Sequence, residues 1–206
     1  MEQRSEEWYA ARLGKVTASR VSDVMAKIKT GEAAARKNYR MELLCERLTS
    51  RQADNFVSGP MQRGIDLEPM ARGMYEGING VLVIETGFVD HPDIDWFGAS
   101  PDGLVVDDGL MEIKCPNTAT HIEFIRTGII DHKYQLQMLV QMMCTGRKWC
   151  DFVSFDDRLP EQLQYRCARV HRDFKKEIDV ITEVKAFLND LAEIEVEMLT
   201  EMEKAA

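Results

Sequence analysis

Three charged residues, Asp102, Glu112 and Lys114, have the types and spacing to hold a divalent metal ion beside a phosphate group. Asp102 lies in a Pro-Asp-Gly turn before one extended run, and Glu112 and Lys114 are two residues apart in the next, so they share one face of a strand. Mg²⁺ prefers fixed carboxylate oxygens, and an adjacent ammonium can orient the attacking water or help to deprotonate it. The pattern predicts metal-assisted hydrolysis of a phosphodiester, although an exposed hairpin with a surface ion pair would show the same three residues.

The element that must position these groups is a hairpin of two strands. Its predicted turn is Asp107-Asp108-Gly109, because Asp-Gly supplies the positive-φ residue of a two-residue hairpin loop. The second strand has a polar face and an apolar face, formed respectively by Leu110, Glu112 and Lys114 and by Met111, Ile113 and Cys115. We therefore predict a sheet that is buried on one side and carries the carboxylates on the other.

The periodicity of apolar residues predicts helices before, between and after the strands. Helical spacing covers residues 5–28, with a break at 17–19, and then 39–50, 61–79, 121–126, 134–144 and 173–203. Extended runs cover 81–84, 87–89, 96–98, 150–155 and 163–170. This order predicts an α+β fold, an α/β sandwich with a mixed central β-sheet flanked by helices. We expect one domain over residues 1–206, with a helical part (1–80), a sheet core with inserted helices (81–172) and a C-terminal helix (173–206).

The composition is that of a globular protein, with 45% hydrophobic and 30% charged residues. No apolar run approaches the roughly 20 residues that span a bilayer, and the N-terminus lacks a secretory signal, so we expect a cytoplasmic location. The five cysteines form no CxxC pair and are expected to be reduced core residues. The net charge is −9, yet residues 1–51 carry 11 Lys/Arg against 7 Asp/Glu, whereas residues 177–206 carry 2 against 9. This uneven charge is compatible with a nucleic-acid partner.

Several other polar residues have plain interpretations when each is taken alone. Ser19 can cap a helix that follows it, Arg12 suits a solvated surface, and Glu68 suits an exposed helix face, although its apolar neighbours make an interior position plausible. Gln137 and Gln141 share one side of a predicted helix. Glutamines that face a core are costly unless they bind something polar.

Taken together, the motifs resemble those of the PD-(D/E)XK nucleases, specifically the lambda-exonuclease-like, YqaJ-type viral recombinases. The resemblance is carried by Ser100-Pro101-Asp102-Gly103, Glu112-Ile113-Lys114-Cys115-Pro116, Trp8, Arg12-Leu13-Gly14, Thr17-Ala18-Ser19, Arg63-Gly64, Glu68, Ala71, Tyr134 and Gln137. It covers most of the chain, and the C-terminal helix matches little beyond its type.

This resemblance implies a Mg²⁺-dependent exonuclease of phage-type recombination, with two ions per site and Mn²⁺ as a substitute. Such an enzyme degrades the 5′-phosphorylated strand of double-stranded DNA ends from 5′ to 3′, releases mononucleotides and leaves a 3′ single-stranded tail. It also implies a ring-shaped homotrimer that works beside a single-strand annealing protein. A basic channel inside such a ring would tolerate an acidic periphery.

The resemblance also implies roles for particular residues. The expected metal ligands are Asp102, Glu112, the Ile113 carbonyl and Glu68. The expected contacts of the terminal 5′ phosphate and DNA are Arg12, Ser19, Ser100, Tyr134 and Trp8. Lys114 would serve the attacking water, and Gln137 would line the catalytic site together with Tyr134.

Three alternatives remain open at this point. Another PD-(D/E)XK enzyme, an endonuclease or a 3′-directed exonuclease, would share the same metal core. A catalytically inactive DNA-binding module is more distant, because Asp102, Glu112 and Lys114 are all intact. If the protein were structural and the charged residues of the hairpin only lay on its surface, the flanking motifs would have to match by chance.

Overall fold

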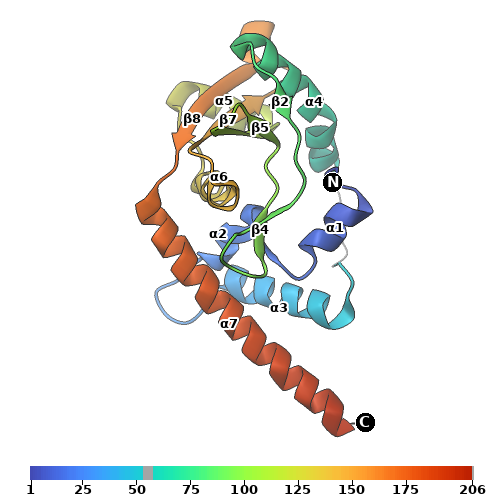
Figure 1. Cartoon of the computed structure of the whole chain (residues 1–206). Coiled ribbons are helices and arrows are strands. Elements are labelled where there is room, and N and C mark those ends of the chain that lie inside the picture. The colour runs from blue at the N-terminus through green and yellow to red at the C-terminus, as the bar shows by residue number, and fades with distance from the viewer. Residues whose placement is uncertain (53–57, 206) are drawn as a thin grey trace.

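A mixed five-stranded sheet forms the centre of this computed structural model, which describes residues 1–52 and 58–205 (Figure 1). In spatial order, its strands are β2 (Val83–Ile84), β5 (Gly103–Val105), β6 (Gly109–Lys114), β7 (Trp149–Phe155) and β8 (Tyr165–His171). β6 and β7 are parallel, and the other neighbours are antiparallel. The crossover between the two parallel strands contains α5 (Thr118–Thr127) and α6 (His132–Thr145). These elements confirm the predicted mixed sheet flanked by helices.

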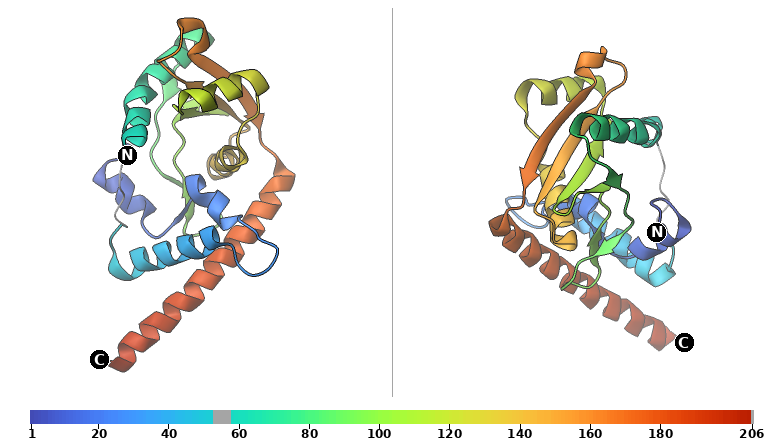
Figure 2. Two further views of the ribbon diagram at one scale, coloured as in Figure 1. Left: turned by 180° about the vertical axis from the view of Figure 1, so that it is seen from behind. Right: turned by 45° about the horizontal axis from the view of Figure 1, so that its top comes forward.

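Helices cover both faces of this sheet, and the right panel of Figure 2 shows it between α4 and α5. α4 (Gly59–Asn79) packs on the face that carries Met111 and Ile113. α6 packs on the face that carries Leu110 and Glu112. The predicted alternation of side chains along β6 is therefore confirmed. The expectation that only one side is buried is wrong, because α6 lies over the polar face.

The hairpin between β5 and β6 differs in detail from the prediction. Val105 pairs with Gly109, so the turn has three residues, 106–108, and its positive φ of 43° belongs to Val106 instead of the glycine. Gly109 has another role, because a Cβ atom there would lie 2.1 Å from the Trp149 ring. The glycine allows β6 to approach β7 beneath that ring.

A second, three-stranded sheet joins the N-terminal part to the hairpin. β1 (Val16–Thr17) pairs in parallel with β4 (Phe97–Ala99), and β3 (Val89–Asp90) pairs with the other edge of β4. α1 (Glu6–Arg12) ends just before Gly14, whose φ of 68° is incompatible with a continuing helix, and the chain then enters β1. The part expected to be helical therefore contributes a strand.

The remaining elements are two 3₁₀ turns (Ala18–Arg20 and Glu161–Leu163), α2 (Val21–Val24), α3 (Ala34–Thr49) and α7 (Phe174–Ala205). Ser19 lies inside the first 3₁₀ turn, and the residue that precedes α2 is Arg20, so the predicted cap by Ser19 is wrong. The Asp173 carboxylate accepts hydrogen bonds from the amides of Lys175 and Lys176, which confirms the predicted start of the last helix.

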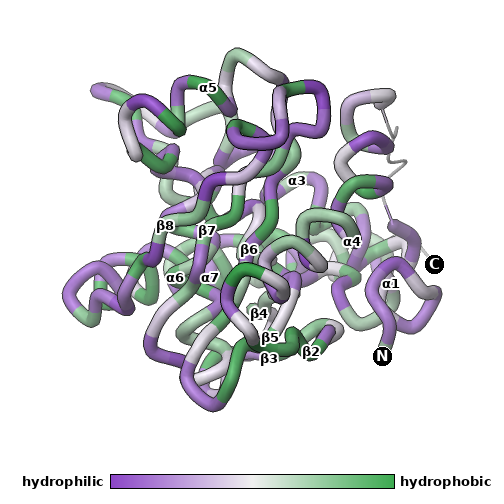
Figure 3. Tube along the Cα trace, turned by 90° about the horizontal axis from the view of Figure 1, so that it is seen from above, coloured by the Kyte–Doolittle hydropathy of each residue, from purple (hydrophilic) through white to green (hydrophobic). Residues whose placement is uncertain are grey.

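The larger hydrophobic core lies between α6, the helices α2 and α3, and α7. Val184 and Leu191 are fully buried on the part of α7 that crosses the body of the molecule. Beyond them α7 extends past the body, and Val196 and Met202 are exposed (Figure 1). The hydrophilic helix α1 lies at the edge of the molecule, beside α4 (Figure 3).

All five cysteines are free: Cys144 and Cys150 are buried, Cys115 and Cys167 are half-buried, and Cys45 is exposed. The expectation that each is a core residue is therefore wrong for Cys45. Within the described part of the chain, no helix combines the length and the apolar character that crossing a membrane requires.

Candidate active site

The predicted metal-binding residues lie at one end of the central sheet, around a cleft of about 570 Å³. Asp102, Ile113 and Lys114 line the cleft. Asp102 follows β4, and its Oδ2 accepts a hydrogen bond from the backbone amide of Ile113 at 2.7 Å. Glu112 lies beneath, where its Oε1 accepts a hydrogen bond from Lys114 Nζ. The structure thus brings these groups together through the pairing of β5 with β6.

The Glu112 carboxylate is held from α6 as well as from its own strand. Gln137 Nε2 donates to Glu112 Oε1, and Gln141 Nε2 donates to Oε2, each at 2.6 Å. These two glutamines are four residues apart, so they project from the same side of the helix. Glu112 is 1% exposed, and the two amides and the ammonium orient a carboxylate that would otherwise be unsatisfied. The polar partner expected for the glutamines is therefore Glu112.

The charges in the cleft influence one another strongly. Burial raises the pKa of Asp102 well above its usual value, and the charges of Glu112 and Glu68 raise it further. Burial alone would lower the pKa of Lys114, but Glu112 and Asp102 outweigh that effect and raise it. Lys114 is therefore an ammonium at neutral pH, which suits a donor to water or phosphate better than a proton acceptor.

Tyr134 forms the wall of the cleft beside this ammonium. Lys114 Nζ lies 5.3 Å from the centroid of the Tyr134 ring, and that ring stacks on Phe152 at 5.6 Å between centroids. Aromatic faces attract cations. The ring thus limits the positions that the lysine can adopt.

Glu68 reaches the same cleft from α4. Its Oε2 accepts a hydrogen bond from Arg4 at 2.6 Å, and Arg72 lies 3.6 Å from Oε1. Its side chain is 13% exposed, so the interior position considered from the sequence is confirmed.

A divalent cation fits the donor set of this cleft. Asp102 and Glu112 supply carboxylates and Ile113 supplies a carbonyl, all oxygen donors. Burial and the charge of Glu112 both disfavour an ionised Asp102, and a positive ion would offset both effects. The described residues contain no ready-made group of three or more His, Cys, Asp or Glu side chains for a metal. An ion here would therefore complete its shell with water, as Mg²⁺ commonly does.

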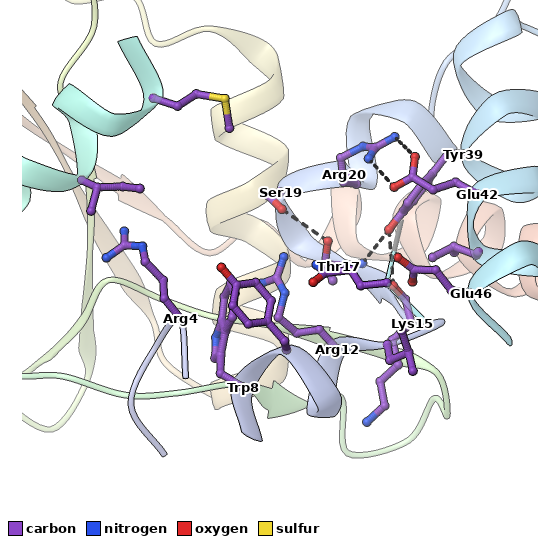
Figure 4. Close-up of a pocket in the computed structure, with 16 residues that line it drawn as sticks. Arg4, Trp8, Arg12, Lys15, Thr17, Ser19, Arg20, Tyr39, Glu42 and Glu46 are labelled. Carbon is purple, nitrogen blue, oxygen red and sulfur yellow. Dashed lines mark hydrogen bonds and ion pairs between the residues drawn. The ribbon is translucent and has the colours of Figure 1, made fainter. Parts of the chain in front are cut away.

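A second cavity, of about 350 Å³, adjoins the cleft. We call it the end cavity; Trp8, Arg12 and Ser19 are among the residues that line it (Figure 4). Trp8 Nε1 donates to Ser100 Oγ at 2.9 Å, and Arg12 donates to the same oxygen at 3.3 Å. The Arg12 guanidinium also lies 4.0 Å from the centroid of the Trp8 ring. Burial lowers the pKa of Arg12, but an arginine remains protonated in proteins. A fixed positive charge is thus held beside a hydroxyl and an aromatic face instead of on an open surface.

The other residues of this second cavity include Ser19, whose Oγ lies 3.3 Å from the Thr17 hydroxyl oxygen. Among the described residues, the charged ones that line it are Arg4, Arg12, Lys15, Arg20, Glu42 and Glu46, so the described cations outnumber the described acids. Arg20 is engaged by both carboxylate oxygens of Glu42 and by Asp23. Of the five residues predicted to contact the phosphate or DNA, Trp8, Arg12 and Ser19 line this cavity and Ser100 hydrogen-bonds to two of them. The fifth, Tyr134, lines the cleft instead.

The two cavities share lining residues and are also linked by a short stretch of the chain. Arg4, Met61 and Ile65 line both of them. The Ser100 hydroxyl accepts hydrogen bonds from Trp8 and Arg12, which line the end cavity, and two residues later Asp102 lines the cleft.

Residues 7–148 match the family model described as the YqaJ-like viral recombinase domain. The chain belongs to this family. It is 55% identical to an alkaline exonuclease, LHK-Exo, from Laribacter hongkongensis, with a TM-score of 0.92, over 98% of this chain and 100% of that chain. A structure of LHK-Exo in complex with dAMP is similar at 54% identity and a TM-score of 0.93, again over 98% and 100% of the two chains. Both comparisons confirm the predicted fold class.

A more distant solved structure shares the fold alone. A phage-related exonuclease from Haemophilus somnus 129PT is 16% identical, with a TM-score of 0.67, over 91% of this chain and 96% of that one. The comparison with curated proteins found no match.

Two residues of this YqaJ-like site were not among those predicted from the sequence. Gln141 was placed on the right side of its helix, and its spacing from Gln137 is the signal that could have identified it as a second partner of Glu112. No local pattern in the sequence identifies Arg4 as a residue of the site, because its contact with Glu68 joins two segments that are distant in the chain.

Proposed function

We propose that this chain degrades the 5′-phosphorylated strand of duplex DNA from its end, in the 5′ to 3′ direction, with Mg²⁺ or Mn²⁺ as its metal. It would release mononucleotides and leave a 3′ single-stranded tail. The broader class does not depend on these details: membership of the recombinase family and 55% identity with an alkaline exonuclease make the chain a deoxyribonuclease of the exonuclease type.

The observation that carries this proposal is the adjacency of two cavities with opposite chemistry. Arg12 and Ser100 suit the terminal phosphate of a strand, because a half-buried guanidinium and a hydroxyl are donors to phosphate oxygens. Asp102 and Glu112 suit a metal ion that activates the next linkage. A strand whose 5′ phosphate occupies the cavity of Arg12 would therefore place its first phosphodiester in the cleft.

A relative supplies consistent chemistry for the product. LHK-Exo has been solved in complex with dAMP, a deoxynucleoside monophosphate. Release of mononucleotides by this chain would give molecules of the same class.

When bound by Asp102, Glu112 and the Ile113 carbonyl, the metal would supply Lewis-acid activation of the phosphate and of a water molecule. The protein's own groups hold the geometry. Lys114, with its raised pKa, donates to water or phosphate and offsets negative charge. Gln137 fixes Glu112 in one orientation, so the carboxylate need not reorganise during the reaction.

The decisive experiment is digestion of otherwise identical duplexes that carry a 5′-phosphate, a 5′-hydroxyl or a blocked 5′ end, in Mg²⁺, with each strand labelled separately. We expect mononucleotides from the phosphorylated strand, slower degradation of the hydroxyl end and an intact complementary strand. Cleavage of a covalently closed circle would support an endonuclease. Degradation from the 3′ end would contradict the proposed direction.

The homotrimer and the annealing partner remain predictions from the resemblance. Light scattering coupled to gel filtration, with and without duplex DNA, would measure the number of subunits. A monomer under both conditions would contradict the ring, without affecting the proposed chemistry of the two cavities.

A further inference from the structure

Arg4 occupies the boundary between the two cavities. Among the described lining residues, it is the one cation shared by both. Figure 4 shows it across the end cavity from Glu42 and Glu46, with its side chain directed away from them. Its guanidinium pairs with Glu68, which lines the cleft.

The backbone that carries Arg4 is anchored to the site. Gln3 Nε2 donates to the carbonyl of Thr86 at 3.0 Å and to that of Pro101 at 2.7 Å, immediately before Asp102. Arg4 itself has a φ of 69°, in a region that non-glycine residues seldom adopt, and Ser5 then caps α1. The chain is thus turned sharply at Arg4, which aims its side chain at the boundary instead of continuing along the surface.

The other cations of the end cavity are already engaged elsewhere. Arg20 is held by Glu42 and Asp23, and Lys15 pairs with Asp90 at 2.6 Å. Arg12 is stacked on an aromatic ring at the back of the cavity. Arg4 pairs with Glu68 at the boundary itself, and its side chain, 41% exposed, is long enough to exchange one anionic partner for another.

We propose that Arg4 binds the phosphate of the first internucleotide linkage, the linkage that is cut, and that its ion pair with Glu68 breaks when this phosphate binds. This inference rests on the proposed function, because it requires the terminal phosphate to occupy the neighbouring cavity. The planar guanidinium can donate to two phosphate oxygens, whereas in the free protein it donates to one carboxylate oxygen of Glu68. Release of Glu68 by the arriving phosphate would also free that carboxylate for the cleft.

The test is a binding measurement without metal, so that no cleavage occurs. Fluorescence anisotropy would compare a 5′-phosphorylated duplex with the same duplex carrying one uncharged methylphosphonate at the first linkage, for the native protein and for Arg4→Gln. We expect the native protein to lose about tenfold in affinity on the neutral linkage, the size of one charge-assisted contact. Arg4→Gln should bind the unmodified duplex about tenfold more weakly and be insensitive to the methylphosphonate.

The matched control is Arg72→Gln, because Arg72 also lies beside Glu68 but lines neither cavity. This variant should retain the native sensitivity to the neutral linkage. Equal sensitivity of the native protein and Arg4→Gln would overturn the proposal. If Arg4→Gln were to fold poorly, Arg4→Lys would replace it, because a lysine keeps the charge and should preserve part of the sensitivity; a lysine variant with none of it and with native affinity would also overturn the proposal.

The failure of this proposal is distinguishable from failure of the proposed function. If the native enzyme showed no preference for a 5′-phosphorylated end, the proposed function would fail and the Arg4 contact with it. If the native enzyme kept that preference while Arg4→Gln responded to the methylphosphonate as the native protein does, the assignment of Arg4 alone would be wrong.

Discussion

The two cavities of the site differ in how far their charges are balanced within the protein. In the end cavity, Arg20 has its carboxylate partners and Arg12 is fixed against Trp8. In the cleft, burial and the neighbouring charge of Glu112 together raise the pKa of Asp102. The end cavity therefore holds a fixed positive charge ready for an anion, whereas the cleft is incomplete until a cation arrives. The comparison suggests that end recognition and catalysis can be separated by substitution.

The largest separation should come from Lys114→Ala. Removal of the ammonium leaves the cleft without its donor to water or phosphate, and one such electrostatic group contributes on the order of 10³-fold in rate. We expect cleavage to be almost abolished while binding of a 5′-phosphorylated duplex persists, measured by product release and by anisotropy. Lys148→Ala, which breaks a surface ion pair with Asp108, is the control. Substantial residual cleavage by the Lys114 variant would remove the lysine from the chemistry.

The opposite separation should come from Arg12→Ala. We expect a loss of about 10- to 100-fold in kcat/KM on 5′-phosphorylated ends, the size of a strong charge-assisted contact, and little change on 5′-hydroxyl ends. Arg166→Ala, which removes an exposed charge from the edge strand β8, should leave both rates unchanged. A variant that lost activity equally on both ends would show that Arg12 supports the structure of the cavity instead of sensing the phosphate.

A smaller effect, confined to the cleft, should come from Gln141→Met. The substitution keeps the volume but removes the donor to Glu112 Oε2, and loss of a group that orients a metal ligand typically costs about 10- to 100-fold. We expect weaker binding of Mn²⁺ in calorimetry and a lower kcat, with the KM for DNA unchanged. Gln135→Met is the matched control, because that glutamine lies on the same helix and donates to the carbonyl of Ile130. A change in KM alone would contradict a role in positioning Glu112.

The cleft was largely predictable from the sequence because local periodicity governs it. Alternation along β6 places Glu112 and Lys114 on one face, and the four-residue spacing places Gln137 and Gln141 on one side of α6. Neither rule predicts that this face of β6 packs against this side of α6. The mistaken expectation of a half-exposed sheet has this cause, since covering Glu112 is a property of tertiary packing.

The end cavity was less predictable because distant segments build it. Parallel pairing of Val16 with Phe97 draws the N-terminal segment against the connection that holds Ser100, and no local pattern announces such a pairing. The plain surface interpretation of Arg12 was wrong for that reason. The prediction of the hairpin turn was wrong for a different reason. Gly109 is required by its close approach to the Trp149 ring, and the positive φ belongs to Val106.

The smallest effect on the chemistry, and a clear one on stability, should come from Asp156→Asn. Asp156 is fully buried at the end of β7, where Arg63 of α4 and Arg158 donate to its carboxylate. Burial alone would raise the pKa of Asp156, but hydrogen bonds from Arg158 outweigh that effect and lower it. A lowered carboxyl pKa stabilises the fold above the pKa of the unfolded chain, and this stability is lost as the pH falls through the folded value.

At neutral pH we therefore expect Asp156→Asn to lower the melting temperature by about 5 °C, because a hydrogen bond to a charged group contributes about 1.5–3 kcal/mol and each kcal/mol corresponds to about 2–4 °C in a chain of this size. The difference from the native protein should shrink below about pH 4, where the aspartate of the unfolded chain begins to be protonated. Because Asp156 lines neither cavity, the ratio of rates on phosphorylated and hydroxyl ends should not change. A changed ratio would mean that the anchoring of α4 through Arg63 reaches the boundary between the cavities, and that end recognition and catalysis are coupled through that helix.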